Sequence, residues 1–154
     1  MQHWLMKSEP DVFGIDDLAH ARRRTTGWDG VRNYQARNFM RDGMARGDQA
    51  FFYHSNCAEP GIAGIVEISR TAYPDPTAFD SKDPHYDPDS TPDKPRWYMV
   101  DVTLVRRLDR VITLTELRKH AEKELKGLAL LRRGNRLSIL PVSERQWRFI
   151  LSLE

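Results

Sequence analysis

The chain has 154 residues, of which 40% are hydrophobic, and its 24 basic and 22 acidic side chains give a net charge of +2. This composition is that of an ordinary globular protein, which argues against a disordered chain, and the length fits one domain over residues 1–154. No apolar run approaches the roughly 20 residues of a membrane-spanning helix, and the single cysteine excludes an intrachain disulfide.

The first third of the chain predicts a strand, two helices and a loop. Residues 2–7 are expected to form a short strand, and residues 14–24 a short helix with an apolar stripe. Residues 25–30 contain two glycines and an aspartate, which favour a loop. A second helix is expected over residues 33–45, because Gly47 follows it as a stop signal.

The middle of the chain predicts three strands and one long loop. Residues 49–55 are rich in aromatic side chains and residues 62–69 in β-branched ones, and the linker between them is short enough for a hairpin. Residues 97–107 are the longest strand candidate. Residues 70–96 hold six of the nine prolines and six aspartates, which predicts an irregular loop with a functional or mobile role.

The end of the chain predicts two helices. Thr113 with Glu116, and Ser143 with Gln146, have the spacing of a helix-capping box, so helices should begin at these points and the first should run to about residue 126. Residues 137–140 are a possible short strand. Short strands mixed with terminal helices indicate the α+β class, with a small, partly closed β-barrel and peripheral helices as the expected architecture.

Basic residues gather in the C-terminal third of the chain. Residues 97–154 hold 12 basic and 7 acidic side chains, whereas residues 1–69 and 70–96 are slightly acidic. A basic sector is compatible with a polyanionic partner, and a solvated basic surface is the alternative. The N-terminus shows no secretory pattern, so a cytoplasmic protein is expected.

Metal and nucleophile motifs are weak. His54 and Cys57 are three residues apart, but nothing supplies further ligands or an orienting group at a sensible spacing. The acidic run around His85 lacks the glycine and closing glutamate of a calcium loop. We therefore expect no metal and no cofactor.

Aromatic and polar side chains lie where elements are expected to end. Trp28 lies in a glycine-flanked loop, where an indole either covers the core or offers a flat surface for stacking a planar ligand. Arg32 and Asn33 come at an expected helix start, which favours an anion, and Arg37 and Arg41 share one helical face with Asn33.

Three expected strand ends add further polar groups. Their candidate residues are Lys7, Ser8, Glu9, His54, Ser55 and Asn56, with Trp97 beginning the third strand. Polar groups gathered at strand ends beside two tryptophans would form a pocket for a planar, hydrogen-bonding molecule such as a nucleobase.

Several motifs resemble those of the EVE domain family. They are Trp-Leu-Met-Lys-Ser-Glu-Pro at 4–10, Trp-Asp-Gly-Val-Arg-Asn-Tyr-Gln-Ala-Arg-Asn at 28–38, Gly-Asp at 47–48, Tyr-His-Ser-Asn at 53–56, Gly-Ile-Ala-Gly-Ile at 61–65 and Arg-Leu-Ser at 136–138. The resemblance covers residues 2–153. It implies a PUA-like fold, which is a small, strongly bent β-barrel with helices around it.

The resemblance also implies a function. The related YTH domain holds methylated adenine of RNA in an aromatic cage, and EVE domains are similarly taken to read modified bases, with modified cytosine in DNA the leading candidate. Trp28 then resembles a cage wall and Trp97 a weaker second wall. The polar pocket residues would be Lys7, Ser8, Glu9, Asn33, His54, Ser55 and Asn56, and the phosphate contacts Arg32, Arg37, Arg41 and Arg136.

Two other functions stay open at this stage. One is an enzyme that acts on a nucleobase or nucleotide with Glu9 or His54 as acid or base, although no third catalytic group accompanies them. The other is a sensor domain that holds a free small molecule. The sequence leaves the choice between DNA and RNA, the modification and the oligomeric state undecided.

Overall fold

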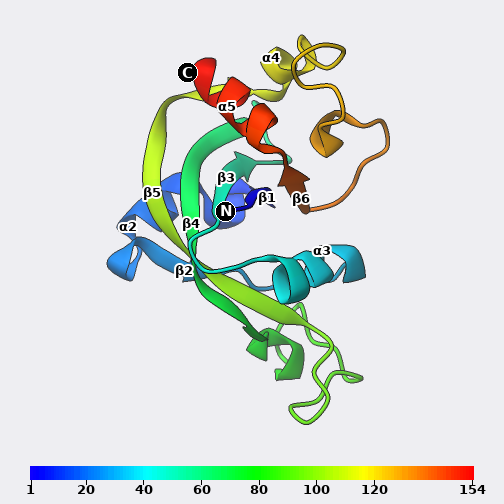
Figure 1. Cartoon of the computed structure of the whole chain (residues 1–154). Coiled ribbons are helices and arrows are strands. Elements are labelled where there is room, and N and C mark those ends of the chain that lie inside the picture. The colour runs from blue at the N-terminus through cyan, green and yellow to red at the C-terminus, as the bar shows by residue number, and fades with distance from the viewer.

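Six strands form one strongly curved sheet, with helices around it, in a computed structural model that describes residues 1–154 (Figure 1). The strands are β1 (His3–Ser8), β2 (Thr25–Gly27), β3 (Gln49–His54), β4 (Gly61–Pro74), β5 (Tyr98–Thr113) and β6 (Ile139–Val142), in the spatial order β2-β5-β4-β3-β1-β6. The helices are α1 (Pro10–Phe13), α2 (Ile15–His20), α3 (Tyr34–Asn38), α4 (Leu114–Arg118) and α5 (Glu144–Ser152).

The sheet is mixed, and its bend comes from its two longest strands. β1 runs parallel to β3 and antiparallel to β6, while β3, β4, β5 and β2 pair antiparallel in turn. The register between β4 and β5 shifts at four places, and such bulges bend and twist a strand. Figure 1 shows these two strands sweeping through the whole molecule. The expected α+β class is confirmed.

Both faces of the sheet are buried, which explains why β1 is apolar on both sides. Trp4 and Met6 contribute to one core cluster, which α2 and α3 help to cover, while Leu5 faces the other cluster beneath α4 and α5. In the second cluster Phe51 stacks on Trp147 of α5 with ring centroids 3.8 Å apart. The alternation of a strand thus places successive side chains in separate cores.

Two expectations about strands and loops need correction. Residues 25–27 were expected in a loop but form β2, because they pair with residues 101–103 of β5. The expected loop from residue 70 begins later, because β4 continues to Pro74 at the edge of the pairing with β5. A short 3₁₀ helix, Pro76–Phe79, follows before the irregular stretch to Trp97.

Both expected helix starts are confirmed, but the reciprocal capping box forms only at Ser143 and Gln146, because the Glu116 carboxylate bonds Arg110 instead of Thr113, and one helix is shorter than expected. Thr113 Oγ1 accepts from the N–H of Glu116, and Ser143 caps α5. The expected helix to residue 126 ends at Arg118 and is followed by turns, because Leu117 and Leu125 are the only buried side chains of that stretch. No helix is long and apolar enough to cross a membrane, and no group of three His, Cys, Asp or Glu side chains could hold a metal ion.

Candidate functional site

A cavity of about 660 Å³ lies where the end of β1 meets the loop after β2. It is lined by Lys7, Ser8, Glu9, Val12, Phe13, Thr26, Gly27, Trp28, Asp29, Gly30 and His85. Four of the nine residues expected to form a base pocket therefore lie together, although β1 and the Trp28 loop are separated by about twenty residues of sequence. A cavity of this size and mixed lining is typical of a small-ligand site.

Trp28 belongs both to the core and to the cavity wall. Its side chain is only 8% exposed, and its indole packs edge-on against Phe52 with centroids 5.5 Å apart. Its backbone N–H donates to the carbonyl of Val100 at 2.8 Å, which extends the pairing of β2 with β5 by one residue. The two alternatives left open by the sequence thus hold together: the indole covers the core and also lines the cavity.

The rim formed by β1 is polar and internally bonded. Ser8 Oγ donates to the carbonyl of Phe13 at 2.6 Å, and Glu9 Oε1 accepts from the side-chain amide of Asn56 at 2.7 Å. Burial lowers the pKa of Lys7, because the cavity wall removes water from its ammonium group. Asn56 does not line the cavity, but its bond holds the Glu9 carboxylate in place.

Asp29 adds a second acidic group to the cavity lining. Loss of hydration raises its pKa, and the negative charge of nearby Asp75 raises it further. The rim therefore offers hydrogen-bond donors from Lys7 and acceptors from Glu9 and Asp29. Such a mixture can bond the polar edge of a heterocycle.

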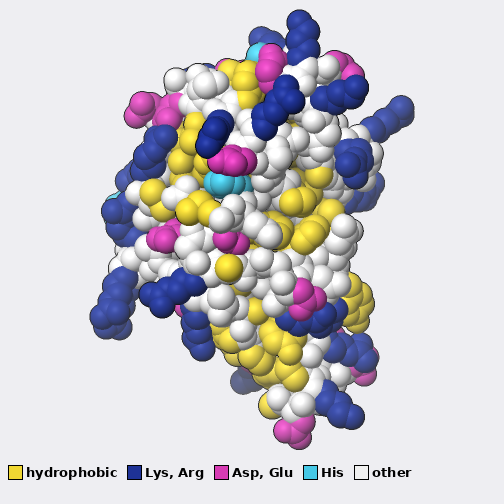
Figure 2. Space-filling view, in the orientation of Figure 1, with side chains coloured by type: hydrophobic (Ala, Val, Ile, Leu, Met, Phe, Trp, Pro, Cys, Tyr) yellow, Lys and Arg dark blue, Asp and Glu magenta, His cyan; other side chains and the backbone are white.

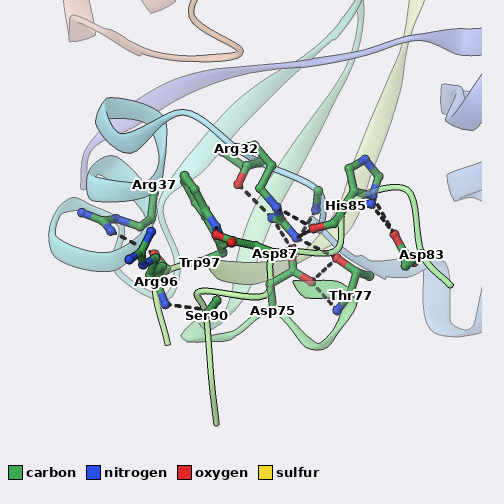
Figure 3. A network of polar contacts seen from close by, with 12 residues as sticks. Arg32, Arg37, Asp75, Thr77, Asp83, His85, Asp87, Ser90, Arg96 and Trp97 are labelled. Atoms are coloured by element: carbon green, nitrogen blue, oxygen red, sulfur yellow. Dashed lines mark hydrogen bonds and ion pairs between the residues drawn. The ribbon is translucent and has the colours of Figure 1, made fainter. Parts of the chain in front are cut away.

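A buried aspartate ties the proline-rich segment to this cavity (Figure 3). Asp75 has a fully buried side chain and accepts from the N–H of Gly30 at 2.8 Å and from Arg32 at 3.0 Å. Burial alone would raise the pKa of Asp75, but its hydrogen bonds from Thr77, Gly30 and Arg32 outweigh this and lower it. Arg32 also donates twice to the carbonyl of His85, which brings that residue to the cavity.

Arg32 therefore has a different set of partners from the expected phosphate. Its guanidinium bonds Asp75, Thr77 and the His85 carbonyl, and it lies over the ring of Trp97 at 5.3 Å. Its N–H groups are therefore occupied within the protein. Arg37 is similarly engaged, since it donates to the Arg96 carbonyl at 2.9 Å.

Trp97 does not line the cavity, so the expected second aromatic wall lies elsewhere. Its indole N–H donates to Asp87 at 2.7 Å (Figure 3), and its ring stacks on Tyr34 with centroids 4.8 Å apart. Arg37 lies over the Tyr34 ring at 4.7 Å. This stack fastens the proline-rich segment to α3.

Other expected pocket residues support the local fold. Asn33 caps α3, because its side-chain oxygen accepts from the N–H of Ala36 at 3.0 Å. His54 Nε2 accepts from the N–H of Ile15 at 3.1 Å, and burial lowers its pKa. Neither residue lines the cavity, nor do Ser55 and Asn56.

The remaining two arginines of the prediction differ in their surroundings. Arg41 pairs with Asp42 at 2.8 Å on the surface. Arg136 lines a separate cavity of about 430 Å³ with Arg132 and Arg133, and none of these three guanidiniums forms an ion pair. Figure 2 shows Lys and Arg side chains projecting around the rim of the molecule.

Seven lining residues were absent from the predicted set: Val12, Phe13, Thr26, Gly27, Asp29, Gly30 and His85. Asp29 and Gly30 follow Trp28 directly, so adjacency was a usable signal. His85 carried none, because it lies 57 residues beyond Trp28 and reaches the cavity through Arg32.

Similarity to known proteins agrees with this architecture. A model of the EVE domain matches residues 2–153. Human thymocyte nuclear protein 1 is 50% identical over 167 residues, which cover 99% of this chain and 73% of that protein. The zebrafish (Danio rerio) protein of the same name is 53% identical, covering 98% of this chain and 71% of its own length.

Two solved structures have nearly the same fold. The human THYN1 protein, in complex with DNA that contains 5-methylcytosine, has a TM-score of 0.95 at 50% identity and covers 99% of this chain and 97% of its own. A protein from Pseudomonas putida has a TM-score of 0.92 at 50% identity and covers 98% of both chains.

Proposed function

Because this chain belongs to the EVE domain family, we propose that it binds a modified base in nucleic acid, with 5-methylcytosine in DNA as the ligand. The cavity beside Trp28 carries the proposal, because it sets one indole against a rim of hydrogen-bonding groups. The complex of human THYN1 protein, at 50% identity, supports the choice of 5-methylcytosine in DNA.

The polar rim suits the edge of cytosine. The exocyclic amino group of cytosine donates hydrogen bonds, and carboxylates are its usual acceptors in proteins. Glu9 or Asp29 would accept from that amino group, while Lys7 would donate to the ring nitrogen or carbonyl oxygen. The base would lie along Trp28, where stacking contributes roughly 1–3 kcal/mol.

Apolar lining would distinguish the methylated base from the plain one. Trp28, Val12 and Phe13 are the hydrophobic residues of the cavity. The methyl group of the base, packed against them, would be removed from contact with water. One such group is worth about 1–3 kcal/mol, so a preference of roughly 10- to 100-fold is expected. A base in a duplex must first leave its stack, at a cost of a few kcal/mol.

Unpaired arginines would hold the backbone of the nucleic acid. Arg37 and Arg136 are the predicted phosphate contacts that form no ion pair, and Arg132 and Arg133 line the same cavity as Arg136. Such contacts give affinity without sequence preference and make it dependent on salt.

We propose that the site binds the base without catalysing a reaction on it. Glu9 is bonded to Asn56, and His54 accepts from a backbone N–H, so neither is joined to a further catalytic group. Incubation with 5-methylcytosine DNA followed by mass spectrometry of the bases should return the substrate unchanged. A cytoplasmic location stays a prediction.

Fluorescence anisotropy with two duplexes that differ by one methyl group tests the proposal. The duplex with 5-methylcytosine should bind about 10-fold or more tightly than its unmethylated twin, and replacing Glu9 by Gln should weaken the binding of both duplexes, because both carry the amino group that Glu9 would accept from. Equal affinity for the two duplexes would contradict the proposal. RNA of the same sequence and the free nucleoside serve as further arms, and tighter binding of either would indicate an RNA reader or a small-molecule sensor.

A further inference from the structure

A third cavity, of about 600 Å³, adjoins the base cavity at β2, because Thr26 and Gly27 line both. Its other lining residues are Arg22, Arg23, Thr25, Ser69, Asp101 and Thr103. We propose that this cavity holds a phosphodiester group of the strand whose base lies beside Trp28. The inference rests on the proposed function and assigns the path of the backbone across β2.

The first observation is a concentration of unpaired positive charge. Arg22, Arg23 and Arg24 are consecutive and exposed, and none of them forms an ion pair with a carboxylate. By contrast, Arg32 and Arg41 are bonded to Asp75 and Asp42. A pair of free guanidiniums beside a cavity is suited to a phosphate, which they can bond through two N–H groups at once.

The one carboxylate of the cavity is already engaged. Asp101 accepts from the hydroxyl of Tyr73, and the guanidinium of Arg70 lies over the Tyr73 ring at 3.7 Å. Two guanidiniums therefore face one bonded carboxylate, and the lining keeps a net positive charge. An anion is expected at the outer arginines, away from Asp101.

The second observation is a hydroxyl without a partner. Ser69 lines the cavity, yet its Oγ is buried and makes no hydrogen bond. Buried polar atoms are nearly always bonded, so a hydroxyl without a partner in a residue of the lining can turn toward a polar ligand without losing a hydrogen bond. Thr25 and Thr103 do not compete for it, since their hydroxyls bond each other at 2.8 Å.

The third observation is the backbone that presents these arginines. Arg23 and Arg24 have φ angles of 56° and 53°. These angles lie in the left-handed region, which residues other than glycine and asparagine seldom adopt. Thr25 Oγ1 donates to the carbonyl of Arg23 at 2.9 Å and helps to hold this turn. Strained positions of this kind concentrate at binding sites.

The test removes the two lining charges without adding strain. In the double variant Arg22→Gln/Arg23→Asn, asparagine tolerates the left-handed φ at position 23. The matched control is Lys119→Gln/Arg145→Gln, which removes two exposed, unpaired charges near α4 and on α5, away from β2 in Figure 1. Circular dichroism verifies that both variants are folded.

Affinity for the 5-methylcytosine duplex is measured from 50 to about 200 mM salt. The slope of log K against log salt should flatten by about 0.9 in the arginine variant, because the two arginines hold one phosphate and a lost phosphate contact removes roughly 0.9. The control should keep the wild-type slope. The affinity for free 5-methyldeoxycytidine, which has no phosphate, should be unchanged in both variants.

The outcomes separate this inference from the proposed function. The phosphate site alone would be overturned if the arginine variant kept the wild-type slope. It would also be overturned if the variant lost as much affinity for the free nucleoside as for the duplex. Wild-type protein that does not distinguish methylated from plain duplex would overturn the proposed function, while the slope would still report whether these arginines contact the backbone.

Discussion

The backbone N–H of Gly30 donates to the carboxylate of Asp75 at 2.8 Å, although 45 residues separate them in sequence. This bond, with the Arg32–Asp75 pair, joins the loop after Trp28 to the proline-rich segment. His85 is placed at the cavity by the same network. The site thus depends on a buried charge outside its own lining.

Replacing Asp75 by Asn should destabilise the protein by roughly 3–5 kcal/mol, because it leaves the largely buried Arg32 without its counter-charge. Urea unfolding at pH 7 measures this change. Asp42→Asn, which removes the exposed partner of Arg41, is the control and should have little effect. Similar losses in the two variants would contradict the buried role of Asp75.

Acid should lower the free energy of unfolding of the wild-type protein, because it protonates the Asp75 carboxylate. The pKa of Asp75 is lower in the folded state than in the unfolded one, so its stabilising effect is complete above about pH 4. The effect is lost as the pH falls through the folded pKa. Unfolding free energies between pH 5 and pH 2.5 should therefore fall more steeply for wild type than for Asp75→Asn, and parallel curves would refute this assignment.

Gly30→Ala should damage both stability and binding. Gly30 has a φ of +77°, and a Cβ there would lie 2.8 Å from the His85 ring, so the substitution adds a clash to the strain of the left-handed backbone. Gly47→Ala is the matched control, because Gly47 has a φ of +93° but nothing within 4 Å of its added Cβ. Both variants should lose about 1–2 kcal/mol of folding stability through backbone strain.

Only Gly30→Ala should also lose affinity for the methylated duplex, because only it displaces a cavity residue. Anisotropy titrations of the two variants, beside their thermal unfolding curves, measure the difference. Equal affinities in Gly30→Ala and Gly47→Ala would show that the position of His85 does not matter for binding.

Trp28→Ala should cost about 3–5 kcal/mol of stability, because the indole is nearly buried and packs on Phe52. Trp28→Phe keeps an aromatic wall and should fold well enough for titration with a reduced methyl preference. Trp97→Phe loses the bond to Asp87 but lies outside the cavity, so its preference should equal that of wild type. If Trp28→Phe kept the wild-type preference for the methylated duplex and Trp97→Phe lost it, Trp97 and not Trp28 would be the aromatic wall of the base site.

His54 should make stability fall in mild acid. Burial lowers its folded pKa below the usual 6.5, so the unfolded chain binds a proton first and stability declines from about pH 6.5 down to the folded pKa. Protonation of Nε2 would remove the acceptor for the Ile15 N–H. His54→Gln, measured by urea unfolding at pH 5, 6 and 7, should show a weaker decline, whereas an unchanged decline would assign the effect to another group such as His3.

Local patterns were enough to predict most elements of the fold. The caps at Thr113 and Ser143 are short-range hydrogen-bond motifs, so both helix starts were correct without tertiary information, although only Ser143 and Gln146 form the full reciprocal box. Residues 25–27 were misjudged, because a three-residue strand exists only through its pairing with β5. The helix expected to reach residue 126 ends at Arg118, because Leu117 and Leu125 are the only buried side chains of that stretch and give it no continuous apolar face.

For the site, the sequence by itself determined two parts of the cavity lining. One is the run Lys7, Ser8 and Glu9 at the end of β1, and the other is Trp28. It could not tell which of the remaining polar residues face the cavity, because Asn33 and His54 satisfy backbone groups instead. Only the tertiary structure decided that Trp97 lies elsewhere and that Arg32, paired with Asp75, brings His85 to the rim. The physical reason is that a buried charge must find its partners wherever the chain places them, and sequence spacing does not record those distances.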